Sequence, residues 1–153
     1  MARFMVDEGI KDLKDNHQSR ELFTYFGLAV YYSQALEQQL ANLIMLMKIS
    51  QGRMVSEEQF TENFQRKLSS SLGQLVNEIG HHFSFTDEET AQLKTLWKQR
   101  NYIVHDYFKQ RIHDTFTEAG RALMITELQE FSAQARELEK KLQGYNVELY
   151  DNI

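Results

Sequence analysis

The strongest pattern in the sequence is an apolar seam in the first third of the chain. Its positions recur every three or four residues, which is the spacing of one face of an α-helix. The pattern predicts a long helix that begins near Ser19 and ends before Gly52, since glycine readily adopts the conformation that ends a helix. The seam positions are Leu22, Phe26, Ala29, Ser33, Leu36, Leu40, Leu43 and Met47.

Three further helices are predicted, each behind a short polar sequence. Residues 56–59, 71–74 and 86–89 each place serine or threonine three positions before glutamate or glutamine. In such a capping box the two side chains bond to free backbone N–H groups at the start of a helix. Apolar residues at helical spacing follow each box. On the third helix they are Leu93, Leu96, Trp97, Val104 and Phe108.

The C-terminal third predicts one more long helix. Residues 115–118 form another capping box, and apolar spacing continues over 117–142, with a stop at Gly144. We therefore expect residues 144–153 to form a C-terminal tail. Residues 1–18 alternate in charge without a period, and we expect them to form an N-terminal arm, irregular or briefly helical.

The predicted fold class is all-α. No stretch alternates as a strand does, and the chain contains no proline, a residue that interrupts helices. The chain also shows no internal repeat and no linker. Residues 1–153 are therefore expected to form a single domain, an antiparallel bundle of four to five helices.

Composition narrows the classes of function. The chain has no cysteine, which excludes disulfides, thiolate metal sites and cysteine nucleophiles. The longest strongly apolar run, Leu40 to Met47, is too short to span a membrane. The N-terminal residues also lack the apolar core of a signal peptide. We therefore expect a soluble, cytoplasmic protein with no membrane contact.

The distribution of charge is more informative than its sum. A net charge of −5 argues against a general nucleic-acid coat protein. Yet the stretch from Lys94 to His113 holds five basic residues and one acidic residue, Asp106. A locally basic stretch on an acidic body suits a confined phosphate site. The alternative is that these cations complement the negative end of a helix.

The candidate site lies within this basic stretch. Arg100 has a planar guanidinium that can hold a phosphate through two hydrogen bonds. His105 is suited to acid–base work near neutral pH. Asn101, four residues before it, shares its helix face and could hold the ring or a substrate oxygen. In RNA the 2′-hydroxyl adjoins the scissile phosphate, so a base and a cation can suffice without a metal.

The spacing of these residues bears on the oligomeric state. Arg100 and His105 lie about 140° apart around an ideal helix, so one straight helix would not bring both to one phosphate. A break in the helix would solve this, and so would a second copy of the motif across a homodimer interface. Glu37, on the flank of the long seam, could face the site and orient Arg100 or His105, or it could be a solvated edge residue.

A structural interpretation of the same residues is also open. Arg100 could pair with a carboxylate while His105 is a satisfied, half-buried residue, and Tyr107 could simply pack over the core at a helix end. A metal site is not predicted. The adjacent His81 and His82 point about 100° apart on a helix and lack a carboxylate or cysteine partner at ligand spacing.

The order R-N-x-x-x-H-x-Y, from Arg100 to Tyr107, resembles the signature of the HEPN domains. These are small all-helical proteins, many of which are metal-independent RNases of bacterial toxin–antitoxin and phage-defence systems. The resemblance implies an endoribonuclease without a cofactor, a hydrolase in which Arg100 and His105 are the catalytic pair and Asn101 is a polar helper. The residues expected to contact RNA are Lys98, Lys109 and Arg111.

The resemblance also implies partners. HEPN RNases are typically homodimers whose two motifs line one cleft. In one branch of the family, a cognate minimal nucleotidyltransferase antitoxin adenylylates the tyrosine two residues after the histidine. That position is Tyr107 here, where added charge and bulk would block RNA entry. The rival hypothesis is a non-catalytic HEPN-like helical module that binds a nucleotide or a protein partner.

Overall fold

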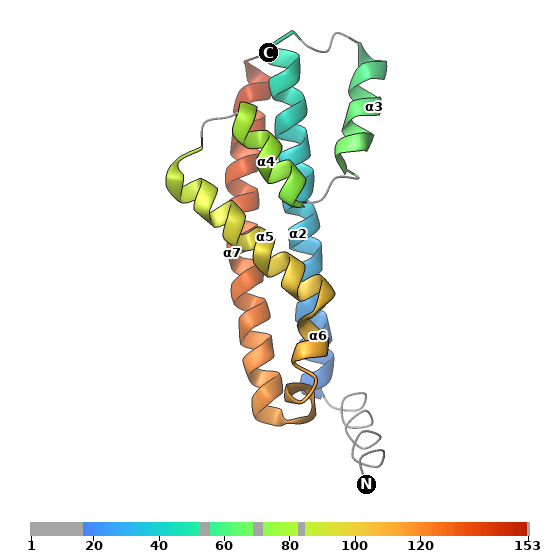
Figure 1. Ribbon diagram of the computed structural model, residues 1–153, viewed down its shortest axis with the longest axis vertical. Helices are drawn as coiled ribbons and strands as arrows, with labels where there is room; N and C mark the ends of the chain where they lie inside the picture. The colour runs from blue at the N-terminus through green and yellow to red at the C-terminus, as the bar shows by residue number, and fades with distance from the viewer. Residues whose placement is uncertain (1–16, 53–55, 69–71, 83–84, 153) are drawn as a thin grey trace.

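The computed structural model describes residues 17–52, 56–68, 72–82 and 85–152, and within these ranges all regular structure is helical (Figure 1). The all-α prediction is therefore confirmed. Most of the predicted N-terminal arm lies outside the described residues. The helices are α2 (His17–Ser50), α3 (Glu57–Leu68), α4 (Leu72–His82), α5 (Asp87–His105), α6 (Tyr107–Gln110) and α7 (Glu118–Asp151), with a 3-10 helix, η1 (Asp114–Phe116), before α7.

The two longest helices, α2 and α7, lie side by side and run in the same direction (Figure 1). At one end, the Gln18 side chain donates a hydrogen bond to the carbonyl oxygen of Glu118, at 3.0 Å. Toward the other end, the Asn146 amide donates to the Gln39 side-chain oxygen, at 2.8 Å. Successive helices from α2 to α5 reverse direction, as predicted, whereas α6 continues in the direction of α5 and α7 reverses again (Figure 1). α2 and α7 are nevertheless parallel, because α3, α4 and α5 intervene.

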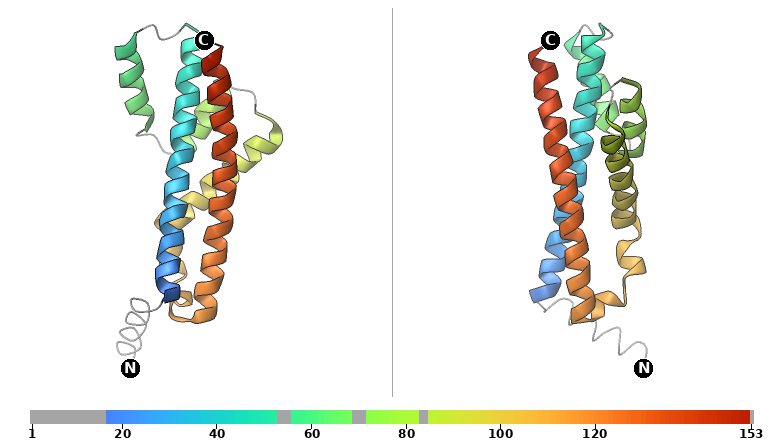
Figure 2. Two further views of the ribbon diagram at one scale, coloured as in Figure 1. Left: turned by 180° about the vertical axis from the view of Figure 1, so that it is seen from behind. Right: turned by 90° about the vertical axis from the view of Figure 1, so that its left-hand side faces the viewer.

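The core lies between α2 and α7, which form the most extensive helix–helix contact. α4, α5 and α6 lie on one side of this pair (Figure 2). The predicted seam on α2 is largely confirmed, since most of its positions are buried. Fully buried side chains of the pair include Leu22, Leu36, Leu40, Leu43 and Ile44 from α2, with Met124 and Leu128 from α7.

The inward face of α5 differs from the predicted one at its C-terminal end. Leu93, Leu96 and Ile103 are buried, whereas Val104, which we expected on the apolar face, is 38% exposed. The spacing of the buried residues places Arg100 on the same inward face. One turn before Arg100, the Trp97 ring lies against Gly73 of α4 so closely that a Cβ on residue 73 would overlap the ring.

The predicted C-terminal tail is wrong. α7 continues through Gly144 to Asp151, because residues beyond the glycine pack on the rest of the fold. Asn146 is buried and bonded to Gln39 of α2. The Tyr145 hydroxyl donates to a carboxylate oxygen of Glu89 in α5, at 2.7 Å. These contacts outweigh the weak helix propensity of one exposed glycine.

Three predicted helix ends can be compared with the structure. The box at Thr86 and Glu89 is confirmed, with both of its hydrogen bonds present. Gly52 ends α2 with φ of 71°, the left-handed conformation expected of it. The box predicted at residues 115–118 is wrong by two positions, because Thr115 belongs to η1 and Thr117 caps α7.

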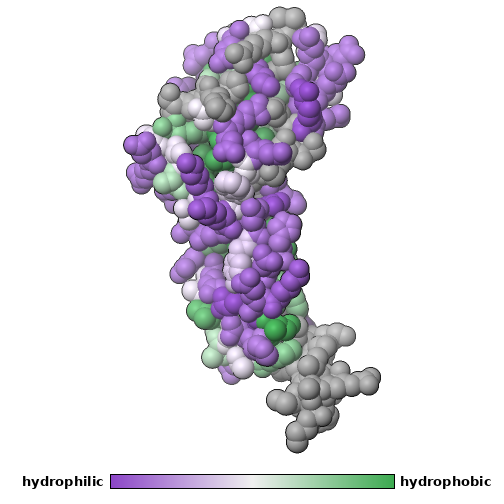
Figure 3. Space-filling model, viewed as in Figure 1, coloured by the Kyte–Doolittle hydropathy of each residue, from purple (hydrophilic) through white to green (hydrophobic). Residues whose placement is uncertain are grey.

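The surface on the side of α5 and α6 is mainly polar, with apolar side chains gathered toward its two ends (Figure 3). Among the described residues, no helix combines the length and the apolar character that a membrane crossing requires.

Candidate functional site

The predicted motif lies at the end of α5 and the start of α6. Arg100, Asn101 and His105 belong to the last turns of α5, and His105 is its final residue. Asp106 bends the chain, with φ of −126° and ψ of −13°, and α6 begins at Tyr107. The helix is therefore continuous from Arg100 to His105, and the break falls immediately after the histidine.

Arg100 points toward α2 and meets Glu37. The guanidinium Nε lies 3.3 Å from a Glu37 carboxylate oxygen, within ion-pair distance but without hydrogen-bond geometry. Its Nη1 donates to the side-chain oxygen of Asn101, at 3.2 Å. Both members of the ion pair are half-buried, with side-chain exposures of 21% for Arg100 and 17% for Glu37. The contact that we considered for Glu37 is thus present, and it is made with Arg100.

Burial dominates the electrostatics of Glu37. Loss of water around the carboxyl raises its pKa, and the opposing effect of the Arg100 charge is smaller. The geometry agrees, because the pair lacks a hydrogen bond that would favour the carboxylate. Glu37 therefore holds Arg100 in place only loosely.

His105 has different surroundings. Its side chain is exposed and has no hydrogen-bond partner within the described parts of the chain. Lys98 and Lys109, two of the cations expected to contact RNA, are also exposed. Arg100 faces α2 while His105 faces solvent, so a single copy of the chain does not bring both to one phosphate in this conformation.

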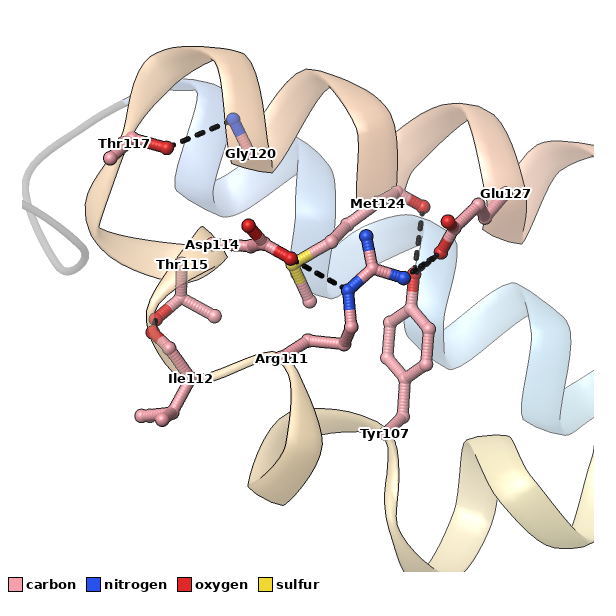
Figure 4. A network of polar contacts seen from close by, with 9 residues as sticks. All are labelled: Tyr107, Arg111, Ile112, Asp114, Thr115, Thr117, Gly120, Met124 and Glu127. Atoms are coloured by element: carbon pink, nitrogen blue, oxygen red, sulfur yellow. Dashed lines mark hydrogen bonds and ion pairs between the residues drawn. The ribbon is translucent and has the colours of Figure 1, made fainter.

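The third expected cation, Arg111, is engaged inside the protein (Figure 4). Its Nε donates to an Asp114 carboxylate oxygen at 2.7 Å, and its Nη1 donates to Oε2 of Glu127 at 2.5 Å. Its guanidinium carbon also lies 5.7 Å from the centre of the Tyr107 ring. Arg111 therefore does not present a free guanidinium to RNA in this conformation.

Tyr107 is a core residue, only 2% exposed. Its hydroxyl donates toward Glu127 Oε2, at 2.9 Å, and lies 3.1 Å from the backbone carbonyl oxygen of Met124. Burial, together with the Glu127 carboxylate, raises the pKa of the phenol above its ordinary value. The surroundings of Tyr107 therefore agree with the alternative that this residue packs over the core. Adenylylation of Tyr107 by a partner stays a prediction. It would require the Tyr107 hydroxyl to leave both of its acceptors, Glu127 Oε2 and the Met124 carbonyl oxygen.

The concave features between α5 and α7 lie apart from the motif pair. A pocket of about 410 Å³ is lined by residues such as Glu88, Thr95 and Glu137. A second pocket, of about 220 Å³, lies beside Tyr107 and Arg111. Neither is lined by Arg100 or His105. Among the described residues, no group of three or more histidine, aspartate and glutamate side chains could hold a metal ion.

Sequence reasoning missed Glu127 and Asp114. Asp114 follows Arg111 by three residues, so local spacing offered a hint of that pair. Glu127 is remote in sequence and gave no such hint. Arg100 could have been recognised as inward-facing, because it falls at helical spacing between Leu96 and Ile103.

Comparisons of this chain with protein-family models, with curated proteins and with solved structures find no match.

Proposed function

We propose that this chain is a metal-independent endoribonuclease of HEPN type, a toxin or phage-defence effector that acts as a homodimer. One observation carries the proposal. An exposed imidazole, His105, ends the helix on which the Arg100 guanidinium bonds to the Asn101 amide and lies within ion-pair distance of Glu37. A base and a phosphate-binding cation are the groups that cleavage through the 2′-hydroxyl requires.

In the proposed reaction, His105 takes the proton of the 2′-hydroxyl as the 2′-oxygen attacks phosphorus. The bond from phosphorus to the 5′-oxygen breaks, the 5′-oxygen takes up a proton, and a 2′,3′-cyclic phosphate remains. Arg100 stabilises the charge on the phosphate. Its Nε faces Glu37 and its Nη1 is bonded to Asn101, which leaves Nη2 for a phosphate oxygen. Lys98 and Lys109 would contact the RNA backbone.

The homodimer is part of the proposal because of the geometry of the motif. Arg100 and His105 diverge on one unbroken helix, so residues of two copies must combine at one phosphate. Exposed apolar side chains suit such an interface: Phe23 and Tyr31 of α2 are 46% and 62% exposed, and Val104, within the motif, is 38% exposed. Phe23 also contacts Phe108, just after the motif.

Cleavage of RNA by the purified protein tests the proposal. We expect cleavage that persists in the presence of a chelator and leaves 2′,3′-cyclic phosphate ends. His105→Ala should lower the rate by about 100-fold or more, because it removes the general base. His113→Ala is the matched control, since it removes another exposed histidine beyond the motif. Undiminished cleavage by His105→Ala, or loss of cleavage with chelator, would contradict the proposal.

The second candidate is a non-catalytic HEPN-like module that binds a nucleotide or a protein. The observation that favours it is the pairing of Arg100 with both Glu37 and Asn101, which would also suit a structural arginine. It predicts no cleavage by the wild-type protein and a nucleotide-dependent rise in melting temperature.

A cognate minimal nucleotidyltransferase is a further proposed partner of the RNase, with Tyr107 as its target.

A further inference from the structure

We propose that Glu127 of α7 is a positioning residue for His105, an inference that rests on the proposed RNase function. Glu127 holds α6 through Tyr107 and Arg111, and α6 determines where the end of α5 lies. We call these three residues the α6 clasp. Figure 4 shows Tyr107 and Arg111 reaching from the α6 region toward the Glu127 carboxylate on α7.

The α6 clasp depends on one carboxylate oxygen. Oε2 of Glu127 accepts from the Tyr107 hydroxyl at 2.9 Å and from Arg111 Nη1 at 2.5 Å. Tyr107 is the first residue of α6, and Arg111 is the residue that caps its other end. A single acceptor on α7 therefore holds both ends of this short helix. Asp114 binds Arg111 from the other side, at 2.7 Å, and keeps its guanidinium in place.

α6 needs these contacts because it is very short. A helix of four residues cannot hold its own conformation in water, since nucleation is unfavourable and few hydrogen bonds follow. Contacts with α2 and with α7 hold it. Phe108 packs edge-on against Phe26 of α2, with ring centres 4.8 Å apart, and this contact is apolar and adaptable. Tyr107 provides the second, directional anchor to α7.

The position of His105 follows from that of α6. Only Asp106 separates the histidine from Tyr107, and the Asp106 N–H still bonds to the Tyr102 carbonyl oxygen, at 2.9 Å. The Tyr107 ring also meets the Tyr102 ring of α5, with centres 5.6 Å apart. Displacement of Tyr107 would therefore disturb the last turn of α5, where the His105 side chain lies exposed.

Amide hydrogen exchange of the full chain tests the α6 clasp without reference to activity. Glu127→Ala removes the acceptor, and Tyr107→Phe removes the hydroxyl but keeps the ring. Both should speed exchange of the amides of residues 106–111 about tenfold and shift the NMR signals of the His105 ring. Glu130→Ala is the matched control, because Glu130 is an exposed glutamate one turn further along α7.

RNA cleavage gives the second readout. Glu127→Ala should lower kcat about tenfold and leave KM nearly unchanged, because a misplaced base affects the chemical step more than binding. Glu127→Gln, which keeps an acceptor oxygen, should recover most of the loss. Tyr107→Phe in the Glu127→Ala background should add little further loss, because both substitutions break the same contact.

The two proposals can fail separately. If the wild-type protein cleaves no RNA, the proposed function fails, while exchange and the His105 signals still decide whether the α6 clasp holds the end of α5. The clasp is overturned if Glu127→Ala behaves like Glu130→Ala in exchange and in the His105 signals. It is also overturned if exchange rises equally in all helices, because Glu127 would then serve global stability alone.

Discussion

Arg100 and Arg111 both meet carboxylates, but in very different ways. Arg111 donates to two of them at hydrogen-bond distance, 2.7 Å and 2.5 Å, and lies over the Tyr107 ring. Among the described residues, Arg100 meets one carboxylate at 3.3 Å without hydrogen-bond geometry, and its side chain donates one hydrogen bond, to its neighbour Asn101. Their exposures are similar, at 21% for Arg100 and 17% for Arg111.

The comparison shows that burial alone does not separate a structural arginine from a functional one. Two carboxylates with directed hydrogen bonds satisfy and immobilise Arg111, as a structural contact requires. One loosely placed carboxylate holds Arg100 near its position and leaves donors for another anion. The partners of the two residues predict that substitutions at Arg111 act on folding and those at Arg100 on function.

The largest effect on stability should come from Arg111→Ala. The variant leaves the Glu127 and Asp114 carboxylates without their cation, and it removes the guanidinium that lies beside the Tyr107 ring. Together these losses should lower the free energy of unfolding by about 2 kcal/mol. Urea denaturation measures this change. Lys109→Ala, two residues away and exposed, should change it by less than about 0.5 kcal/mol. Equal losses of unfolding free energy in Arg111→Ala and Lys109→Ala would contradict a structural role for Arg111.

Arg100→Ala should have a smaller effect on stability and a larger one on cleavage. We expect a loss of about 1 kcal/mol in the free energy of unfolding, because Glu37 can take up a proton when its partner is removed. Cleavage should fall by about 100-fold, because charge on the phosphate is no longer stabilised. Urea denaturation and RNA cleavage measure the two quantities in parallel. Arg136→Ala, an exposed arginine on α7, serves as control. If the cleavage rate of Arg100→Ala falls only in proportion to the fraction of folded protein, the role of Arg100 is structural.

The smallest effect concerns Glu37 and pH. Burial raises the pKa of this carboxyl above its ordinary value of 4.5, so its stabilising contribution is full below that pH. The contribution is lost as pH rises through the folded-state pKa. Glu37→Gln cannot ionise, so its free energy of unfolding relative to wild type should rise by up to about 1 kcal/mol between acidic and neutral pH. Denaturant titrations at both pH values measure this, and the opposite sign would show that attraction to Arg100 outweighs burial.

The parts of the fold that local sequence determines could be predicted. The α2 seam and the Thr86 capping box depend on residues a few positions apart, and both are present. The end of α7 could not be predicted in this way, because it depends on contacts of Asn146 and Tyr145 with helices far away in sequence. Exposure of Val104 in place of Ile103 reflects the angle at which α5 crosses the pair, which periodicity does not specify.

In the candidate site, too, some contacts could be expected from the sequence and others could not. Arg100 and Glu37 each occupy inward helical positions, so their meeting could be considered from the sequence. The α6 clasp could not, because it requires the bend at Asp106 and the exact register of α6 on α7. The motif from Arg100 to Tyr107 resembles one functional unit in the sequence. In space Arg100 faces α2 and Tyr107 faces α7, while His105 between them faces solvent.

The parallel arrangement of α2 and α7 has a consequence for how the chain folds. Side chains that meet across this pair, such as Gln39 and Glu139, are 100 positions apart in the sequence. Most helical bundles fold quickly because their contacts join residues that are close in the sequence. This core instead forms only when two helices that are far apart in the sequence come together. During synthesis the apolar seam of α2 therefore lacks its most extensive contact until α7 has left the ribosome. We expect chaperone contact with the nascent chain over that interval.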